Sequence, residues 1–161
     1  MKEIEFILVT EENKNLAIKI AKEIFPYEVS PKGIFLPRNK IKRTIDSSNK
    51  LGEFFIIKDG RFNAGIIGYS YNNHLPKFDE LWIDYFGIRK KHRGSGLGKK
   101  VLLKTLSLMK EFNVNLQTVK LYSSNIAEEK DSHHLYRCVG FKIYAHKNEK
   151  PDHIYYFKME V

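Results

Sequence analysis

The order of hydrophobic and polar positions along the chain predicts a mixture of strands and amphipathic helices. Short apolar runs predict strands at residues 3–9, 53–58, 63–71, 78–88, 118–123, 141–146 and 154–161. Apolar residues at helical spacing predict helices at residues 12–25, 38–47, 96–112 and 132–139. The pair Asp59-Gly60 between two apolar runs predicts a tight hairpin turn. This order predicts an α+β fold, a mixed α/β sheet with helices on both faces.

The helix at residues 96–112 has the clearest pattern. Its apolar positions recur close to every turn and form one face, made of Leu97, Val101, Leu102, Leu108, Met109 and Phe112. In the helix at residues 12–25, Leu16, Ile20 and Ile24 share a face, and Pro26 ends the helix. The helix at residues 96–112 is therefore expected to pack on a sheet.

Length and composition are those of one folded unit. The chain has 161 residues, 42% of them hydrophobic, and it carries no repeat or low-complexity linker, so a single domain over residues 1–161 is expected. No apolar run approaches the roughly 20 residues of a membrane span. The first residues are acidic rather than leader-like, and the only cysteine, Cys138, fits a reducing compartment. A cytoplasmic protein without a membrane partner is expected.

The formal net charge of +9 favours an anionic partner, which could be nucleic acid, an acidic membrane or a phosphorylated cofactor. The basic residues concentrate locally at Arg89, Lys90, Lys91, Arg93, Lys99 and Lys100. No helix-turn-helix or base-stacking motif accompanies them, so nucleic acid is not expected as the partner. The six histidines have no metal-ligand spacing, so no metal is expected either.

A glycine-rich segment lies inside this basic cluster, between a predicted strand and a predicted helix. It reads Arg93-Gly94-Ser95-Gly96-Leu97-Gly98, with glycine at alternate positions. Glycine lets a backbone approach a ligand closely, and free amides at a helix N-terminus bind phosphate groups. The spacing departs from a P-loop, because Arg93 and Lys100 stand where that motif needs Gly and Ser or Thr. It also departs from the dinucleotide fingerprint, whose third glycine would come one residue later.

The segment from Ile88 to Gly98 resembles motif A of the GNAT acetyltransferases, the V-x-P-x-Y-R-G-x-G-I-G pattern, with Lys90 at the proline and His92 at the aromatic position. A second stretch, Leu135 to Phe141, resembles the family's Y-x-x-x-G-F, in which a helix ends on a glycine before a strand. The resemblance implies the GNAT acyl-CoA N-acyltransferase fold, with a central, mostly antiparallel twisted sheet of about seven strands flanked by about four helices.

The resemblance implies acetyl-CoA as co-substrate. Its diphosphate would lie on the amides of Arg93, Gly94, Ser95, Gly96, Leu97 and Gly98, with added charge from Lys99 and its neighbours. Its pantetheine arm would pair with the strand edge at Phe86, Gly87 and Ile88, where Gly87 suits a bulge. Asn125 is a further candidate contact, although the segment at residues 126–131 is longer than usual and puts Glu129 at the family's offset.

Three side chains are candidates for proton transfer. Asp84 stands where polyamine acetyltransferases of the superfamily have a catalytic glutamate, and Glu80 on the same strand is the alternative base. Tyr136 matches the tyrosine that protonates the departing thiolate in many members. The alternatives are that Asp84 orients substrate or caps a buried amide, and that Tyr136 only packs against the cofactor.

The function expected from this resemblance is transfer of an acetyl group from acetyl-CoA to a primary amine, in a ternary complex and without a covalent intermediate. A small-molecule acceptor is favoured, and Asp79, Glu80 and Asp84 could attract a cationic one. A non-catalytic acyl-CoA-binding regulator and a protein or peptide N-acetyltransferase remain open as alternatives. Homodimers are frequent in the family, but the sequence specifies neither an interface nor an acceptor.

Overall fold

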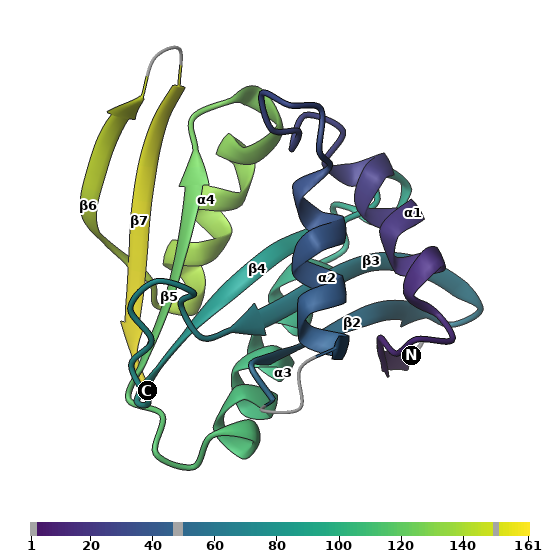
Figure 1. Ribbon diagram of the computed structural model, residues 1–161, viewed down its shortest axis with the longest axis horizontal. Helices are drawn as coiled ribbons and strands as arrows, with labels where there is room; N and C mark the ends of the chain where they lie inside the picture. Colours follow the sequence, from purple (N-terminus) through teal and green to yellow (C-terminus); the bar gives the residue numbers. More distant parts are fainter. Residues whose placement is uncertain (1–2, 47–49, 150–151) are drawn as a thin grey trace. The chain divides into compact units, whose positions relative to one another are not determined.

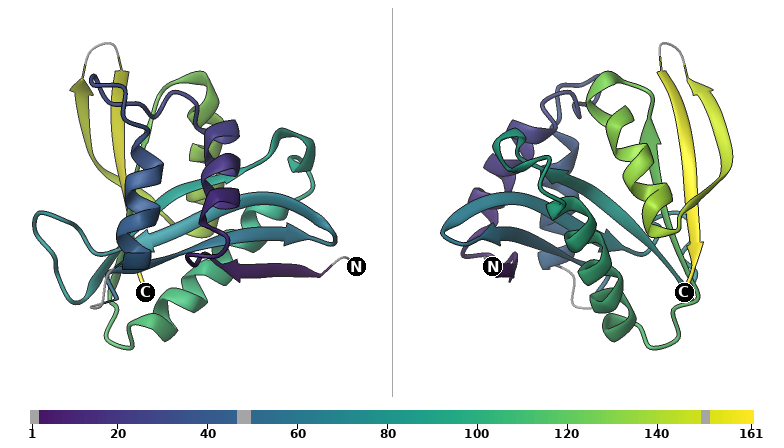
Figure 2. Two further views of the ribbon diagram at one scale, coloured as in Figure 1. Left: turned by 45° about the vertical axis from the view of Figure 1, so that its right-hand side comes forward. Right: turned by 180° about the vertical axis from the view of Figure 1, so that it is seen from behind.

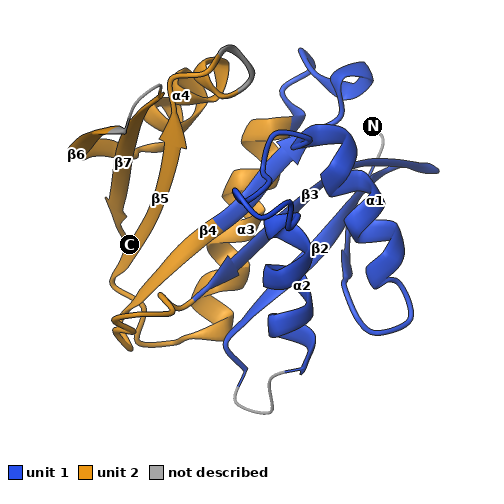
Figure 3. Ribbon diagram, turned by 45° about the horizontal axis from the view of Figure 1, so that its top comes forward, with its two compact units in different colours: residues 1–70, 84–97 blue, residues 71–83, 98–161 orange. Residues whose placement is uncertain are grey.

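The computed structural model describes residues 3–46, 50–149 and 152–161. Seven strands follow one another in the order β1-β2-β3-β4-β5-β7-β6 in a single sheet (Figure 1). The residues divide into two compact units, which Figure 3 distinguishes by colour. One unit comprises Met1–Ser70 and Asp84–Leu97, and the other comprises Tyr71–Ile83 and Gly98–Val161. Strand β4, Glu80–Ile88, contributes residues to both units.

The first unit contains the antiparallel strands β1 (Ile4–Leu8), β2 (Gly52–Asp59) and β3 (Phe62–Ser70) and the second part of β4. The helices α1 (Lys14–Ile24) and α2 (Leu36–Asp46) contact each other and pack against β3 and β2 respectively. Their apolar faces bury Ile20, Ile41, Phe54 and Ile66 in one core. Figure 1 shows the two helices side by side. This core fixes α2 beside the sheet.

The second unit contains the first part of β4, the helices α3 (Leu97–Phe112, from Gly98 on) and α4 (Ala127–Val139), and three strands. The strands are β5 (Thr118–Ser124), β6 (Lys142–Glu149) and β7 (Asp152–Glu160). Strand β5 pairs in parallel with β4 and antiparallel with β7, and β7 pairs antiparallel with β6. Helix α4 contacts β5, and the right-hand view of Figure 2 shows the two side by side.

The predicted order of elements is confirmed, and the differences are local. Helix α4 begins at Ala127, five positions before the predicted start at Ser132, so the segment that had looked like an insertion is its first turn and a half. Leu16 is 39% exposed, and the buried face of α1 is made by Ala17, Ile18, Ile20 and Ala21. The predicted end of α2 at Ser47 lies outside the described residues. Among the described residues, every helix is too short or too polar to cross a lipid bilayer.

Candidate active site

The glycine-rich segment forms an exposed turn between β4 and α3. After a 3-10 turn at Lys90–His92, Arg93 is extended, with φ −82° and ψ 161°. Gly94 and Gly96 have φ of +84° and +81°, a conformation that costs other residues about 1–2 kcal/mol. No heavy atom lies within 4 Å of a Cβ placed on either glycine. The glycines are thus required by the backbone conformation and not by crowding, and the turn is open to a ligand.

The main-chain amides of this turn are available for binding. The N–H of Arg93 donates to the Lys90 carbonyl at 3.3 Å. In the described part of the chain, the N–H groups of Gly94, Ser95 and Gly96 donate to no protein atom, and all three residues are exposed. Helix α3 begins at Leu97, so its first-turn amides also lack partners within the helix. Outward amides backed by a helix N-terminus fit the diphosphate of coenzyme A.

Two arginines of the basic cluster hold this segment in place. Arg93 Nε donates to the Ile88 carbonyl at 2.8 Å, which ties the turn to the end of β4. Arg89 forms an ion pair with Glu23 and donates from Nη1 to the Asn63 carbonyl at 2.9 Å. Lys90, Lys91, Lys99 and Lys100 are exposed. The positive charge of the cluster is therefore carried outward mainly by its lysines.

The end of β4 departs from regular strand geometry at Tyr85, two residues before Gly87, where a bulge was predicted. Tyr85 has φ +45°, which is uncommon for a residue with a side chain. The backbone of Gly87 is not left-handed, and its lack of a side chain has another reason. A Cβ there would lie 2.5 Å from Ile24 Cγ2 and 2.9 Å from Phe25 Cζ. Gly87 is thus needed for the close approach of α1, while the irregular backbone belongs to Tyr85.

Asp84 is held by residues from two neighbouring elements. Its Oδ2 accepts a hydrogen bond from Ser70 Oγ of β3 at 2.6 Å, and its Oδ1 lies 3.7 Å from Lys40 Nζ of α2. Only 11% of its side chain is exposed. Burial raises the pKa of Asp84 above its ordinary 3.8, and Lys40, the Ser70 hydrogen bond and Arg43 oppose this rise. A buried, oriented carboxylate with a raised pKa is suited to accept a proton.

Glu80 lies on the same strand but is engaged by structural partners. Its Oε1 lies 2.5 Å from Lys120 Nζ of β5, and its Oε2 accepts from Trp82 Nε1 at 3.3 Å. The residue is 7% exposed. Lys120 is in close contact with Glu80, whereas Lys40 lies 3.7 Å from Asp84, so Asp84 is the less tightly paired of the two candidate bases.

Tyr136 is buried on α4 among aromatic rings. Its ring packs edge-on against Phe141 and Phe157, with centroids 6.2 and 5.4 Å away. Burial raises the pKa of Tyr136, as does the negative charge of Glu129, and a hydrogen bond with Ser132 opposes them. The phenol therefore keeps its proton throughout the neutral range, as a proton donor must.

Asn125 is used by the protein itself. Its N–H donates to the His153 carbonyl at 3.0 Å, and its Oδ1 accepts from the His153 N–H at 2.9 Å. Glu129, at the family's offset, accepts from the N–H of Ser124 at 2.9 Å and from its hydroxyl. Both residues thus fix the start of α4 against β5 and β7.

The predicted site residues fall into two groups. Asp84, Phe86, Gly87, Ile88, Arg93, Gly94, Ser95, Gly96 and Leu97 belong to the first unit, whereas Glu80, Gly98, Lys99, Asn125 and Tyr136 belong to the second. Sequence reasoning missed Lys40, Ser70 and Tyr85. Lys40 lies in the helix predicted at residues 38–47, next to Ile41, which the structure buries completely. Among the described residues, no three His, Cys, Asp or Glu side chains are grouped to hold a metal ion.

The comparisons with known proteins agree with this geometry. A sequence model of the Acetyltransferase (GNAT) family matches residues 16–141. The chain belongs to the GNAT acetyltransferase family. The resemblance to this family and the fold class inferred from the sequence are confirmed. The prediction of an acyltransferase is confirmed at the level of the family, which uses acetyl-CoA. A comparison of the sequence with curated proteins finds no match.

Solved structures of GNAT proteins have the same fold. A protein from Desulfovibrio desulfuricans assigned to the GNAT acetyltransferases is 12% identical, with a TM-score of 0.76 over 98% of this chain and 99% of that one. Spermidine N-acetyltransferase from Vibrio cholerae, solved with CoA and spermine, is 15% identical, with a TM-score of 0.72 over 98% and 95% of the two chains. A GNAT acetyltransferase from Streptococcus pneumoniae is 14% identical, with a TM-score of 0.70 over 99% of each chain.

Proposed function

We propose that the protein transfers the acetyl group of acetyl-CoA to a primary amine of a small molecule, by direct attack within a ternary complex. The observation that carries this proposal is the turn at Gly94, Ser95 and Gly96, whose exposed amides have no protein acceptor among the described residues. Such a turn at a helix N-terminus is a binding group for a diphosphate. The CoA complex of the similarly folded Vibrio cholerae enzyme supports the choice of ligand.

The proposed cofactor-binding residues have separate tasks. The amides from Gly94 to Gly98 hold the diphosphate, and Lys99 contributes positive charge near it. Arg93 orients the turn through its hydrogen bond to Ile88. The edge of β4 at Phe86, Gly87 and Ile88 pairs with the pantetheine arm. When bound, acetyl-CoA supplies the acetyl thioester. Asn125 has the weakest case, because its backbone N–H and side-chain oxygen already bond to His153.

Asp84 is the proposed general base. An alkylammonium has a pKa near 10.4, so only about one molecule in 2,500 is the neutral nucleophile at pH 7. The Asp84 carboxylate, oriented by Ser70, accepts the proton that the amine loses. Glu80 is the less favoured base, because its ion pair with Lys120, at 2.5 Å, is closer than the 3.7 Å between Asp84 and Lys40.

Tyr136 is the proposed proton donor to the departing thiolate. Because burial raises the pKa of its phenol, the hydroxyl stays protonated throughout the neutral range, where the reaction is assayed. Its ring contacts with Phe141 and Phe157 restrict its orientation. This role and that of Asp84 are proposed independently, since they belong to different units.

Detection of the released thiol tests the proposal. The purified protein is mixed with acetyl-CoA and a panel of amines, and the free thiol is followed over time. We expect thiol release that depends on both the protein and the amine. Acetyl-CoA binding without amine-dependent release would instead support a non-catalytic acyl-CoA-binding protein. Release with peptides but with no small amine would support a protein or peptide N-acetyltransferase.

A further inference from the structure

The Asp84 carboxylate stands beside two basic residues of helix α2. Lys40 Nζ lies 3.7 Å from Asp84 Oδ1, and the positive charge of Arg43 also acts on this carboxylate. Ser70 completes the surroundings with an uncharged hydrogen bond. Among the described residues, the charges that act on Asp84 are thus cationic. The proposed base, Asp84, therefore carries one negative charge, and the two residues Lys40 and Arg43 near it carry two positive charges.

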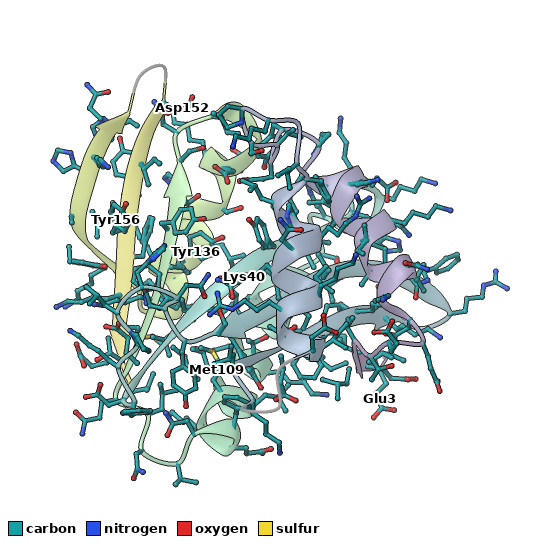
Figure 4. All side chains as sticks on the ribbon, viewed as in Figure 1. Glu3, Lys40, Met109, Tyr136, Asp152 and Tyr156 are labelled. Atoms are coloured by element: carbon teal, nitrogen blue, oxygen red, sulfur yellow. The ribbon has the colours of Figure 1, made fainter. Side chains whose placement is uncertain are left out.

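Helix α2 holds these cations in place. Ile41 is completely buried and anchors the helix in the core of the first unit, next to Lys40 in sequence. Lys40 and Arg43 are three positions apart, so they are neighbours on one side of the helix. Both are half-buried, whereas Lys42 is exposed. Figure 4 labels Lys40 on this helix. The two cations are therefore part of the surroundings of Asp84 and not freely solvated charges.

We infer that the acceptor carries an anionic group next to its amine, as an amino acid does. This inference rests on the proposed function and narrows its substrate class. The ammonium group of such a zwitterion faces Asp84, and its carboxylate faces Lys40 and Arg43. Each charge then has a partner of opposite sign, and the side chain of Lys40 remains 22% exposed to meet it.

The same charges disfavour a polyamine. A second ammonium group near Asp84 would meet Lys40 and Arg43, and like charges at such distances repel each other. Two of the three acidic residues that the sequence offered as an attraction for a cation are also engaged. Asp84 is paired with Lys40, and Glu80 is paired with Lys120. Complementary charge at a binding site selects one partner and rejects the other.

Matched acceptors test the inference. Thiol release is measured with glycine, phenylalanine and glutamate, with the α-carboxamide of each, and with spermidine. We expect kcat/KM to be at least tenfold higher for the best of these amino acids than for its amide. The amide lacks the carboxylate charge and so loses one charge-assisted interaction. The amine of an amide is the less basic of the two, so intrinsic reactivity works against this result. Equal or higher kcat/KM for the amides or for spermidine overturns the inference.

Variants of α2 assign the preference to Lys40. Lys40→Met should reduce the ratio of acid to amide kcat/KM at least fivefold, and Lys40→Arg should keep most of it. Lys42→Met removes the same charge from the exposed side of the helix and should leave the ratio unchanged. Equal ratios in Lys40→Met and Lys42→Met overturn the assignment. The acetyl-CoA-induced rise in melting temperature identifies folded variants, and Lys40→Arg tests the role if Lys40→Met does not fold.

The two proposals fail in different ways. Turnover of amides or spermidine without a preference for the carboxylate leaves the acetyltransferase activity in place and overturns the inference alone. Binding of acetyl-CoA without thiol release from any acceptor overturns the proposed activity, and the inference with it.

Discussion

Asp84 meets two requirements of a general base that usually conflict. It is shielded from water, with 11% of its side chain exposed, yet the hydrogen bond from Ser70 and the nearby charge of Lys40 keep its ionised form accessible. We expect Asp84→Asn to lower kcat about 100-fold or more, within the range for loss of a general base, and to change acetyl-CoA affinity little. Thiol-release kinetics and cofactor titration measure the two quantities.

Asp79→Asn is the matched control, because it makes the same chemical change at an exposed acid of the same chain. If Asp84→Asn and Asp79→Asn have equal kcat values, Asp84 is not the base. If Asp84→Asn weakens acetyl-CoA binding as much as it lowers kcat, its effect is on the fold or the cofactor and not on the proton.

The pH dependence of the reaction also reports on Asp84. Its carboxylate must be ionised to accept a proton, so kcat/KM falls as pH drops through its pKa. Burial raises that pKa above the ordinary 3.8, so the loss begins at a higher pH than for an exposed aspartate. Lys40 and Arg43 lower the pKa, so Lys40→Met should move the acid limb further upward. A pH–rate profile in which Lys40→Met moves the limb downward, or no further than Lys42→Met, contradicts this account.

At the scale of elements, the turn before α3 depends on two left-handed glycines. Gly96 has φ +81° and open space around its Cα, so Gly96→Ala adds backbone strain without a clash. We expect this strain to rotate the adjacent amides and to weaken acetyl-CoA binding about tenfold. The effect on the unbound protein should be only about 1–2 kcal/mol of unfolding free energy. Calorimetric titration and chemical denaturation measure the two effects.

Gly33 provides the control for this substitution. Its φ of +79° and its open surroundings match those of Gly96, but it lies in the loop before α2. Gly33→Ala should therefore cost a similar unfolding free energy and leave acetyl-CoA affinity unchanged. Equal losses of affinity in both variants would mean that the turn before α3 is not the diphosphate site.

The elements that the sequence predicted well are those determined by local signals. The hairpin of β2 and β3 was predicted from consecutive residues, although its turn is Gly60-Arg61, one position after the predicted Asp59-Gly60. The strand, glycine turn and helix around Gly94 also depend on consecutive residues. The partners of Asp84 do not, because Lys40 and Ser70 reach it from other elements and no spacing in the sequence predicts such a meeting. The reason for Gly87 was likewise hidden, since it depends on α1 approaching β4. Helix α4 was predicted too short because its first turn carries acids and no apolar face.

At the scale of the whole molecule, the net charge of +9 and the glycine turn predict different responses to anions. A general attraction to positive charge is unspecific and strongly weakened by salt, whereas a built site recognises one ligand. At 100-fold excess over its dissociation constant, acetyl-CoA should stabilise the native state by about 2.7 kcal/mol. For a chain of this size that corresponds to a rise in melting temperature of roughly 5–10 °C.

Inorganic pyrophosphate at the same concentration separates these two sources of stabilisation. It carries the diphosphate charge but none of the groups that would pair with the edge of β4, so a specific site should respond to it far less than to acetyl-CoA. Raising the salt concentration should reduce the pyrophosphate response further and leave most of the acetyl-CoA response. Equal shifts with both ligands that disappear together in salt would show that the positive charge alone binds them. That result would show that the turn at Gly94, Ser95 and Gly96 is not a specific coenzyme A site.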